Sequence, residues 1–284
     1  MSSSVQYEYG AQVQGRHAGR FLFVVSHMRS FSSLLCHILG SHPEISGYSE
    51  AHLSYFGRLD LQRLARKVQQ VTGNPMLGRY VLDKILHSHR EIAPGILDRP
   101  ELKVLFLLRN PEDTFQSILN MSRLRGAKRK RDDMGLAPFD EPSMRLMTQG
   151  MLLNQSGFSD PARVLEYYVE RLQQLEGYGA RLGGAAHFIE SEKLISDTDQ
   201  VLAGLSRWLE LGEPLTTGYR TFRFTGAPGH GDPSPAILSG TVVRDDGDRH
   251  RHYIPVPISD DMLRRGIEAH AACRSGLARY CAPA

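Results

Sequence analysis

Two short apolar runs in the first half of the chain, Phe21 to Val25 and Val104 to Leu108, have the length and composition of buried strands. Each run is followed by a short polar turn and then by apolar residues at helical spacing. This order is typical of parallel strands that are joined by crossover helices. The pattern therefore predicts an α/β fold in which helices flank a parallel sheet, giving three layers.

Other stretches extend this pattern. Leu59 to Val71 has the spacing of an amphipathic helix, and Tyr80 to Leu97 begins as a strand and then predicts a helix that stops before Pro94. Pro161 predicts the start of a long helix that reaches about Gly179, and Ala185 to Leu211 predicts one more strand and helix.

The 284 residues fit one domain, residues 1–284, with two irregular additions. Residues 123–160 contain a break in composition with Gly, Pro, a basic run and then acids, which predicts a lid or an insertion that lines an acceptor pocket. Residues 226–257 predict a C-terminal loop that wraps over the surface. Solvated charge is the alternative interpretation of the basic run.

Composition narrows the class of protein. Hydrophobic residues make up 41% and charged residues 23%, which is typical of an ordinary soluble protein. The net charge of +3 is too small to predict a nucleic-acid partner, and the longest strongly apolar runs are too short to cross a membrane. The three cysteines form no CxxC pair, which favours a reducing, cytoplasmic location. The sequence carries no sign of the oligomeric state.

The turn after the first apolar run has the features of an anion site. A helix that begins directly after a strand presents free backbone N–H groups, and its dipole favours an anion by about 0.3–1 kcal/mol. Ser30, Ser32 and Ser33 add hydroxyl donors, and Arg29 adds a planar cation. The G-x-x-x-x-G-K-[ST] pattern of nucleotide triphosphatases is missing here, which counts against ATP- or GTP-driven chemistry.

The same residues resemble a family. The run from Arg29 to Leu35, R-S-F-S-S-L-L, is similar to the R-S-G-[ST]-[ST]-L-L loop of sulfotransferases that use 3′-phosphoadenosine-5′-phosphosulfate. The resemblance continues, in the family's order, through "GSHPEISGYSE", "VLDKILHSH", "VLFLLRNPEDTFQSIL" and "FIESEKLISDTDQVLAGLSRWLEL". It implies a single sulfotransferase domain with a P-loop NTPase-like architecture. It also implies that the product is adenosine 3′,5′-bisphosphate and that no metal is needed.

The resemblance also assigns two anion sites. The 5′-phosphosulfate would be held by Arg29, Ser30, Phe31, Ser32, Ser33 and Leu34, and the 3′-phosphate would be held by Arg109 and Ser117. Pro111 would fix the turn that carries Arg109. For Arg109 the alternative interpretation is a helix cap with a surface salt bridge.

Phe31 departs from the family pattern, which has glycine at this position. Glycine lets a backbone approach a phosphate or take a positive φ, whereas a bulky aromatic residue does neither easily. We expect the ring to point into the acceptor pocket, to stack on the base, or to pack in the core.

The resemblance places the catalytic base just after the first helix, where Glu50 stands, with His52 as its competitor. Lys84 would neutralise the charge on the leaving bridging oxygen. Of the nearby histidines, His87 and His89, one would line the acceptor site, and His89 fits an ordinary exposed position better.

The tail holds four potential metal ligands: His230, Asp232, His250 and His252. Their irregular spacing argues against a metal site. The favoured interpretation is a Gly-containing loop that carries Ser234 and Arg244 to the 3′ end of the nucleotide, and a plain solvated loop is the alternative.

Three functions follow from these observations. The first is a sulfotransferase that acts on the hydroxyl of a small-molecule or lipid-like acceptor. The second is a small-molecule kinase of related fold, which the missing Walker lysine disfavours. The third is a nucleotide-binding protein that has lost catalysis, for which Phe31 is the best support.

Overall fold

The computed structural model of the chain describes residues 19–120, 158, 160–226, 232, 235–243 and 256–281. Within these residues, five parallel strands form one sheet in the order β2-β3-β1-β4-β5. Their bounds are β1 Arg20–Ser26, β2 Ile45–Ser46, β3 Tyr80–Ile85, β4 Leu102–Leu108 and β5 Ala186–Glu190. The predicted parallel sheet is confirmed, and the two-residue β2 is an addition to it.

The helices connect these strands and cover both faces of the sheet. Their bounds are α1 Ser32–Ser41, α2 Arg58–Thr72, α3 Pro94–Leu97, α6 Pro161–Leu182, α7 Lys193–Ser196, α8 Thr198–Trp208 and α9 Asp260–Tyr280. Residues 111–120 are also helical. No helix in the described part of the chain is long and apolar enough to cross a membrane.

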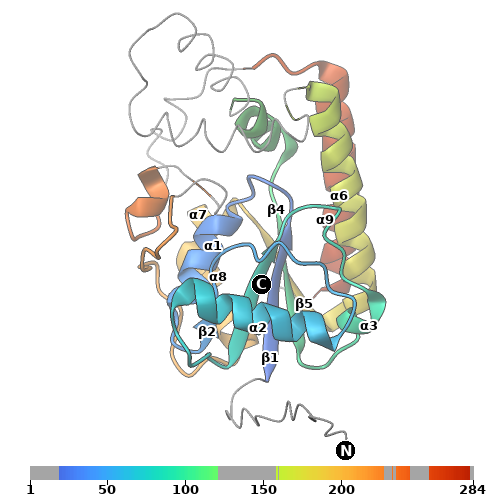
Figure 1. Cartoon of the computed structure of the whole chain (residues 1–284). Coiled ribbons are helices and arrows are strands. Elements are labelled where there is room, and N and C mark those ends of the chain that lie inside the picture. Colours follow the sequence, from blue (N-terminus) through green and yellow to red (C-terminus); the bar gives the residue numbers. More distant parts are fainter. Residues whose placement is uncertain are drawn as a thin grey trace, which may run out of the picture.

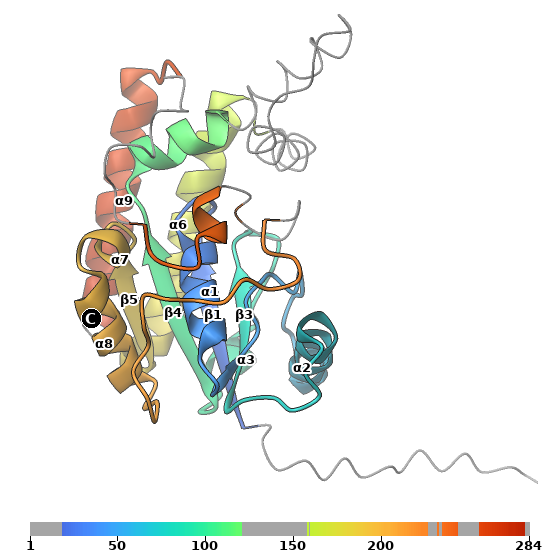
Figure 2. The same ribbon diagram turned by 90° about the vertical axis from the view of Figure 1, so that its left-hand side faces the viewer.

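Alternating strand residues divide the core in two, as the pleat requires. Phe23 and Val25 face a core that α2, α3, α6, α9 and residues 111–120 complete, whereas Leu22 and Val24 face a core built with α1, α7 and α8. Figure 1 shows α2 crossing in front of the sheet, and Figure 2 shows α1 in front of the strands with α6 behind them. The predicted three-layer α/β architecture is confirmed.

One predicted helix is wrong. After β3 the chain makes turns through residues 86–93, and a short helix, α3, begins at Pro94 rather than ending before it. Proline is favoured in the first turn of a helix because it lacks the N–H that would be unpaired there.

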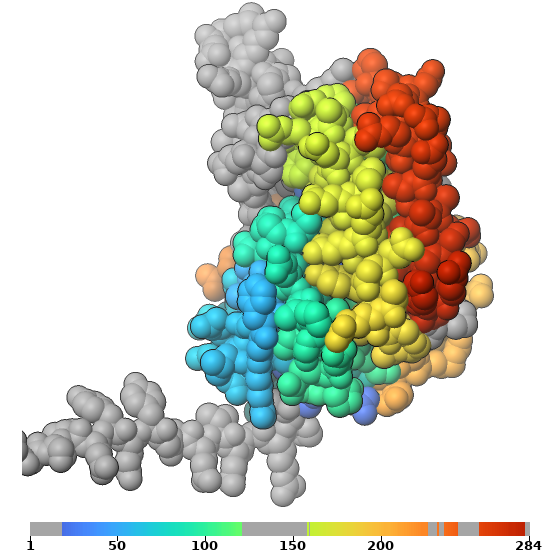
Figure 3. Space-filling model, turned by 90° about the vertical axis from the view of Figure 1, so that its right-hand side faces the viewer, coloured from blue at the N-terminus to red at the C-terminus, as the bar shows by residue number. Residues whose placement is uncertain are grey.

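The long C-terminal helix α9 was not among the predicted elements. It lies beside α6 on one face of the molecule (Figure 3). A glycine of α6 allows the close approach of α9, since a Cβ at Gly179 would lie 2.6 Å from the Leu277 side chain. This packing fixes α6, whose side chains reach the carboxyl ends of the strands.

Candidate active site

The turn between β1 and α1 has an unusual backbone. Arg29 and Phe31 both have left-handed conformations, with φ of 65° and 59°. Residues other than glycine rarely adopt such φ values, and they cluster at ligand-binding turns. Turns that combine right- and left-handed residues form the backbone concavities that hold phosphates. The turn therefore has the conformation that the family's glycine would favour, although Phe31 stands in its place.

The ring of Phe31 has a definite partner. The guanidinium carbon of Arg109 lies 4.4 Å from the centre of the Phe31 ring, within the range of a cation–π contact. The side chain also packs against the α1-side core, as does Leu34. Of the three expected placements, the ring has the one in which it packs in the core, and the Arg109 guanidinium lies over the ring.

The serines of the turn are held in place by neighbouring groups. The Ser30 hydroxyl accepts a hydrogen bond from Ser26 at 2.6 Å and donates to the His27 carbonyl at 2.9 Å. The Ser33 hydroxyl accepts from Lys84 Nζ at 3.1 Å and from the Asp232 amide at 3.0 Å. Ser32 is buried in the first turn of α1. Lys84 thus reaches from β3 into the turn.

The two predicted anion sites touch each other. Arg29 Nε donates to the Ser117 hydroxyl at 2.8 Å, and Arg109 Nη1 donates to the Arg29 carbonyl at 2.9 Å. Two carboxylates accompany these cations: Asp232 lies 3.4 Å from Arg29 Nη1, and Asp113 lies 3.1 Å from Arg109 Nη2. The structure therefore brings Arg29, Arg109 and Ser117 into one polar cluster at the carboxyl ends of β1 and β4.

A helix cap follows β4, and it is made by Asn110, the residue next to Arg109. The Asn110 side-chain oxygen accepts from the Asp113 amide at 2.9 Å, which satisfies a free N–H of the helical residues 111–120. The cap and the contacts of Arg109 therefore occur together.

Glu50 lies among cationic and imidazole groups. Its carboxylate is 3.6 Å from Lys84 Nζ, 3.6 Å from His52 Nδ1 and 3.9 Å from His87 Nε2. Only 12% of the Glu50 side chain is exposed, and only 1% of the Lys84 side chain. Burial lowers the pKa of His87 to about 4, so this imidazole is neutral at pH 7. Lys84 thus bridges the candidate base and the Ser33 hydroxyl.

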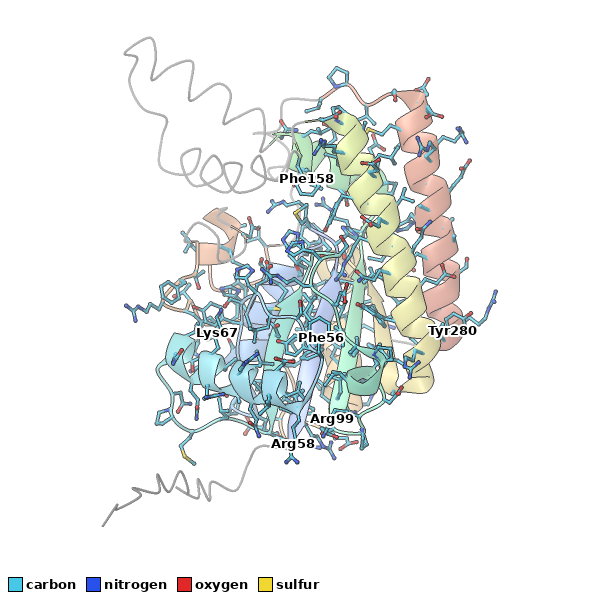
Figure 4. The ribbon with its side chains drawn as sticks, turned by 45° about the vertical axis from the view of Figure 1, so that its right-hand side comes forward. Phe56, Arg58, Lys67, Arg99, Phe158 and Tyr280 are labelled. Atoms are coloured by element: carbon cyan, nitrogen blue, oxygen red, sulfur yellow. The ribbon has the colours of Figure 1, made fainter. Side chains whose placement is uncertain are left out.

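Beside Glu50, on the side of α2, is a hollow of about 20 Å³, room for a single water. It is too small to admit an acceptor. At the carboxyl end of the sheet, above the strands in Figure 4, Phe158 packs edge-on against Tyr167 with ring centres 5.0 Å apart. His87 and His89 stack on each other nearby at 5.2 Å.

Sequence reasoning missed His27, which joins the two anion turns. Its Nε2 accepts the Arg109 amide at 3.0 Å, so Nδ1 carries the proton and donates to the Met28 carbonyl at 2.9 Å. Burial lowers the pKa of His27 to about 3, which keeps the ring neutral. A histidine two residues after the apolar run Phe21 to Val25 was the signal available in the sequence.

Two residues of α6 were missed for a different reason. The Tyr167 hydroxyl accepts the Met28 amide and donates to the Leu86 carbonyl, both at 2.8 Å. Arg171, fully buried, donates to the Ser26 and Ile85 carbonyls at 2.9 and 2.7 Å. They come from a distant part of the chain, and helical periodicity marks them only as core positions.

Several predicted residues lie outside the described part of the chain. These are Ser234 and Arg244, three of the histidine-rich tail residues (His230, His250 and His252), and most of residues 123–160 and 226–257. Among the described residues, no group of three or more His, Cys, Asp or Glu side chains is arranged to hold a metal ion.

Comparisons with known proteins agree with this architecture. No family model and no curated protein matches the chain. Among solved structures, the sulfotransferase domain from the Synechococcus PCC 7002 olefin synthase matches with a TM-score of 0.52 and 18% identity, covering 91% of this chain and 96% of that one. The sulfotransferase domain from the curacin biosynthetic pathway matches with a TM-score of 0.48 and 20% identity, covering 89% and 98%. At these identities, the likeness to the first domain shows a shared fold.

Proposed function

We propose that this protein is a sulfotransferase that moves a sulfuryl group from 3′-phosphoadenosine-5′-phosphosulfate to the hydroxyl of an acceptor. The observation that carries the proposal is the position of Lys84. Its Nζ lies 3.1 Å from the Ser33 hydroxyl of the β1–α1 turn and 3.6 Å from the Glu50 carboxylate. The buried cation Lys84 therefore lies between the turn that would bind the anion and Glu50, the candidate base.

The two arginines favour a nucleotide that carries phosphate groups at both the 3′ and the 5′ positions of its ribose. The 5′-phosphosulfate would occupy the β1–α1 turn with Arg29, and the 3′-phosphate would meet Arg109 and Ser117. Arg29 lies 3.4 Å from the Asp232 carboxylate. Binding of the phosphosulfate would therefore exchange an arginine–carboxylate pair for an arginine–phosphate pair, which offsets part of the cost of desolvating Arg29.

The transfer itself needs alignment, charge neutralisation and a base. A bond forms between the acceptor oxygen and sulfur, and the bond between sulfur and the bridging phosphate oxygen breaks. Glu50 takes the proton of the acceptor hydroxyl, while Lys84 neutralises the charge that develops on the bridging oxygen. Lys84 and the N-terminus of α1 supply the positive charge, so the proposed mechanism includes no metal.

The acceptor in this proposal is a small-molecule or lipid-like hydroxyl compound. It would approach Glu50 from the side of His87 and Phe158. The three cysteines are free, buried thiols, which agrees with the reducing, cytoplasmic location that we propose.

Isothermal titration tests the donor. Adenosine 3′,5′-bisphosphate should bind the wild-type protein, and Arg29→Ala should weaken that binding by about 10- to 100-fold, as expected for one charged hydrogen-bonding partner. ATP with magnesium is the control ligand. Preferential binding of ATP would favour the kinase alternative, and bisphosphate binding without transfer to any acceptor in a broad panel would favour the inactive nucleotide-binding protein.

A further inference from the structure

Strand β3 carries a carboxylate residue and a cationic residue next to each other, and their side chains point to opposite faces of the sheet. Lys84 pairs in register with Val24 and reaches the α1 side, where Ser33 lies. Asp83 pairs with Phe23 and faces the core on the α2 side, with 1% of the residue exposed. Asp83 has no role in the proposed sulfuryl transfer, and its burial is unusual for a carboxylate.

Three donors surround the Asp83 carboxylate. Oδ1 accepts the Ala51 amide at 2.6 Å and the Lys84 amide at 2.8 Å, and Oδ2 accepts the Tyr55 hydroxyl. Ala51 directly follows Glu50 in the chain. One carboxylate therefore ties the loop that carries the candidate base to the strand that carries the candidate cation.

The peptide groups around Ala51 are fixed from both sides. The Ala51 carbonyl accepts from Lys67 Nζ of α2 at 2.6 Å, and Figure 4 shows Lys67 on this helix. The next residue, His52, has a positive φ of 54°. A strained backbone of this kind persists only where its surroundings hold it in place, and such strain concentrates at functional sites. Residues 47–55, which we call the Glu50 loop, are thus held by Asp83, Tyr55 and Lys67.

The arrangement is costly for the fold. Asp83 lies beside the packed rings of Phe23 and Tyr55, whose centres are 4.5 Å apart. Burial raises the pKa of Asp83 to about 7, even though the Tyr55 hydroxyl and the two amides lower it. Burial of a carboxylate costs free energy that hydrogen bonds offset only in part, so the presence of Asp83 calls for another explanation.

We propose that Asp83 and Tyr55 form a positioning pair that holds the Glu50 carboxylate beside Lys84. This inference rests on the proposed function, because it gives the pair a role in sulfuryl transfer. A displacement of about 1 Å at a reacting group can cost about 10²-fold in rate. Loss of the pair would free the Glu50 loop while leaving in place Arg29 and the β1–α1 turn, which are held by Ser117, Arg109 and Ser26 instead.

The test compares three variants of the full chain. Asp83→Asn puts an amide donor against the Tyr55 hydroxyl, and Tyr55→Phe removes that hydroxyl alone. Tyr80→Phe is the matched control, since Tyr80 is also buried at β3 and its hydroxyl donates to the Leu209 carbonyl at 3.0 Å, away from Glu50. We measure the dissociation constant of adenosine 3′,5′-bisphosphate, sulfate release from the phosphosulfate donor to water, and hydrogen exchange of residues 47–55.

We expect Asp83→Asn to slow sulfate release by about 10- to 100-fold and Tyr55→Phe by about tenfold, with nucleotide affinity within twofold of the wild type. Exchange of residues 47–55 should become faster in both variants. Tyr80→Phe should leave all three measurements near the wild type. Sulfate release at the wild-type rate, or parallel losses in Tyr80→Phe, would overturn the proposal.

The two proposals can fail separately. If the wild-type protein binds no bisphosphate, the proposed function fails, and hydrogen exchange still decides whether the pair holds the loop. Unchanged exchange of residues 47–55 in Asp83→Asn would then overturn the positioning role. If Asp83→Asn does not fold, Tyr55→Phe supplies the same comparison.

Discussion

Glu50 is the residue on which the proposed chemistry depends most directly. Glu50→Gln keeps the size of the side chain but removes its ability to take a proton. A positioned base contributes about 10²–10⁴ in rate, so sulfate transfer should fall by that factor. Binding of adenosine 3′,5′-bisphosphate should be retained, because the proposed phosphate contacts come from Arg29, Arg109 and Ser117 and not from Glu50. Titration and a transfer assay with the same protein samples measure both effects.

His52→Gln is the control for this assignment. The His52 side chain is 46% exposed and lies 3.6 Å from the Glu50 carboxylate. Its replacement should have a much smaller effect if Glu50 is the base. If Glu50→Gln transfers the sulfuryl group at nearly the wild-type rate and His52→Gln does not, His52 is the base.

Phe31 provides a prediction about backbone strain. A left-handed conformation costs an L-residue about 1–2 kcal/mol, and glycine escapes this cost. Both Phe31→Ala and Phe31→Gly remove the ring that packs on Arg109, but only alanine keeps the strain at φ 59°. The glycine variant should therefore be more stable than the alanine variant by about 1 kcal/mol in urea unfolding. Equal stabilities would mean that the turn relaxes once the ring is gone.

The candidate site was predictable where it depends on strand ends. Parallel strands bring their carboxyl ends to one edge of the sheet, so Arg29 and Arg109 were expected near each other, and their contact at the Arg29 carbonyl shows how near. The support beneath them was not predictable. Tyr167 and Arg171 reach the site from a helix more than 130 residues along the chain from Met28 and Ser26, and no local pattern records such a contact.

At the scale of elements, the pattern predicted strands better than their connections. Fully apolar runs such as Val104 to Leu108, within β4, need burial on both faces, which only a central strand provides. Residues 86–93 have apolar positions at helical spacing, but their backbone serves the site instead. The Leu86 carbonyl accepts from the Tyr167 hydroxyl at 2.8 Å, and the Ile92 amide donates to the Tyr178 hydroxyl at 3.2 Å. Tertiary contacts thus replaced the helical hydrogen bonds.

Arg171 joins α6 to two strands, and its replacement tests that connection. Arg171→Met would leave the Ser26 and Ile85 carbonyls without their donors, each at a cost of about 1–3 kcal/mol. Relief of a buried charge offsets part of this loss, because burial lowers the pKa of Arg171. We expect urea unfolding to show a net loss of about 2–4 kcal/mol.

Arg181→Met is the matched control on the same helix. Arg181 pairs with Asp98 at the surface, 2.8 Å from Nε to Oδ1, where solvent screens the pair. Its replacement should leave the midpoint of unfolding nearly unchanged. If Arg171→Met is as stable as Arg181→Met, water or a shifted side chain must donate to the Ser26 and Ile85 carbonyls in its place.

In the described part of the chain, imidazoles are buried or partly buried on both faces of the sheet, and 24% of the His87 side chain is exposed. His27 and His87 lie near the proposed site, His37 lies on α1, and His187 lies on β5 against Trp208. Burial lowers the pKa of His27 to about 3 and the pKa of the other three to about 4, from the usual 6.5. All four are therefore neutral in the folded protein at pH 7, and the fold depends on their staying neutral.

This dependence predicts acid-sensitive stability. Below pH 6.5 the unfolded chain binds protons at these four histidines, whereas the folded protein does not until about pH 4, so the free energy of unfolding falls as the pH falls. Each such proton contributes about 1.4 kcal/mol per pH unit. Asp83 acts in the opposite direction, since its folded pKa of about 7 exceeds the usual 3.8 and the folded protein takes up its proton first.

Between these pKa values the unfolded chain holds four more protons on the histidines than the folded protein, and the folded protein holds one more on Asp83. The unfolded chain therefore binds three more protons in total. The free energy of unfolding should therefore fall by up to about 4 kcal/mol per pH unit between pH 6 and 4.5. Urea midpoints at pH 7.5, 6 and 5 measure this slope. Asp83→Asn removes the opposing group, so its slope should be steeper than that of the wild type by about 1.4 kcal/mol per pH unit. Stability that does not change from pH 7.5 to pH 5 would show that the histidines are protonated within the folded protein, with their charges accommodated by movements of the surrounding groups.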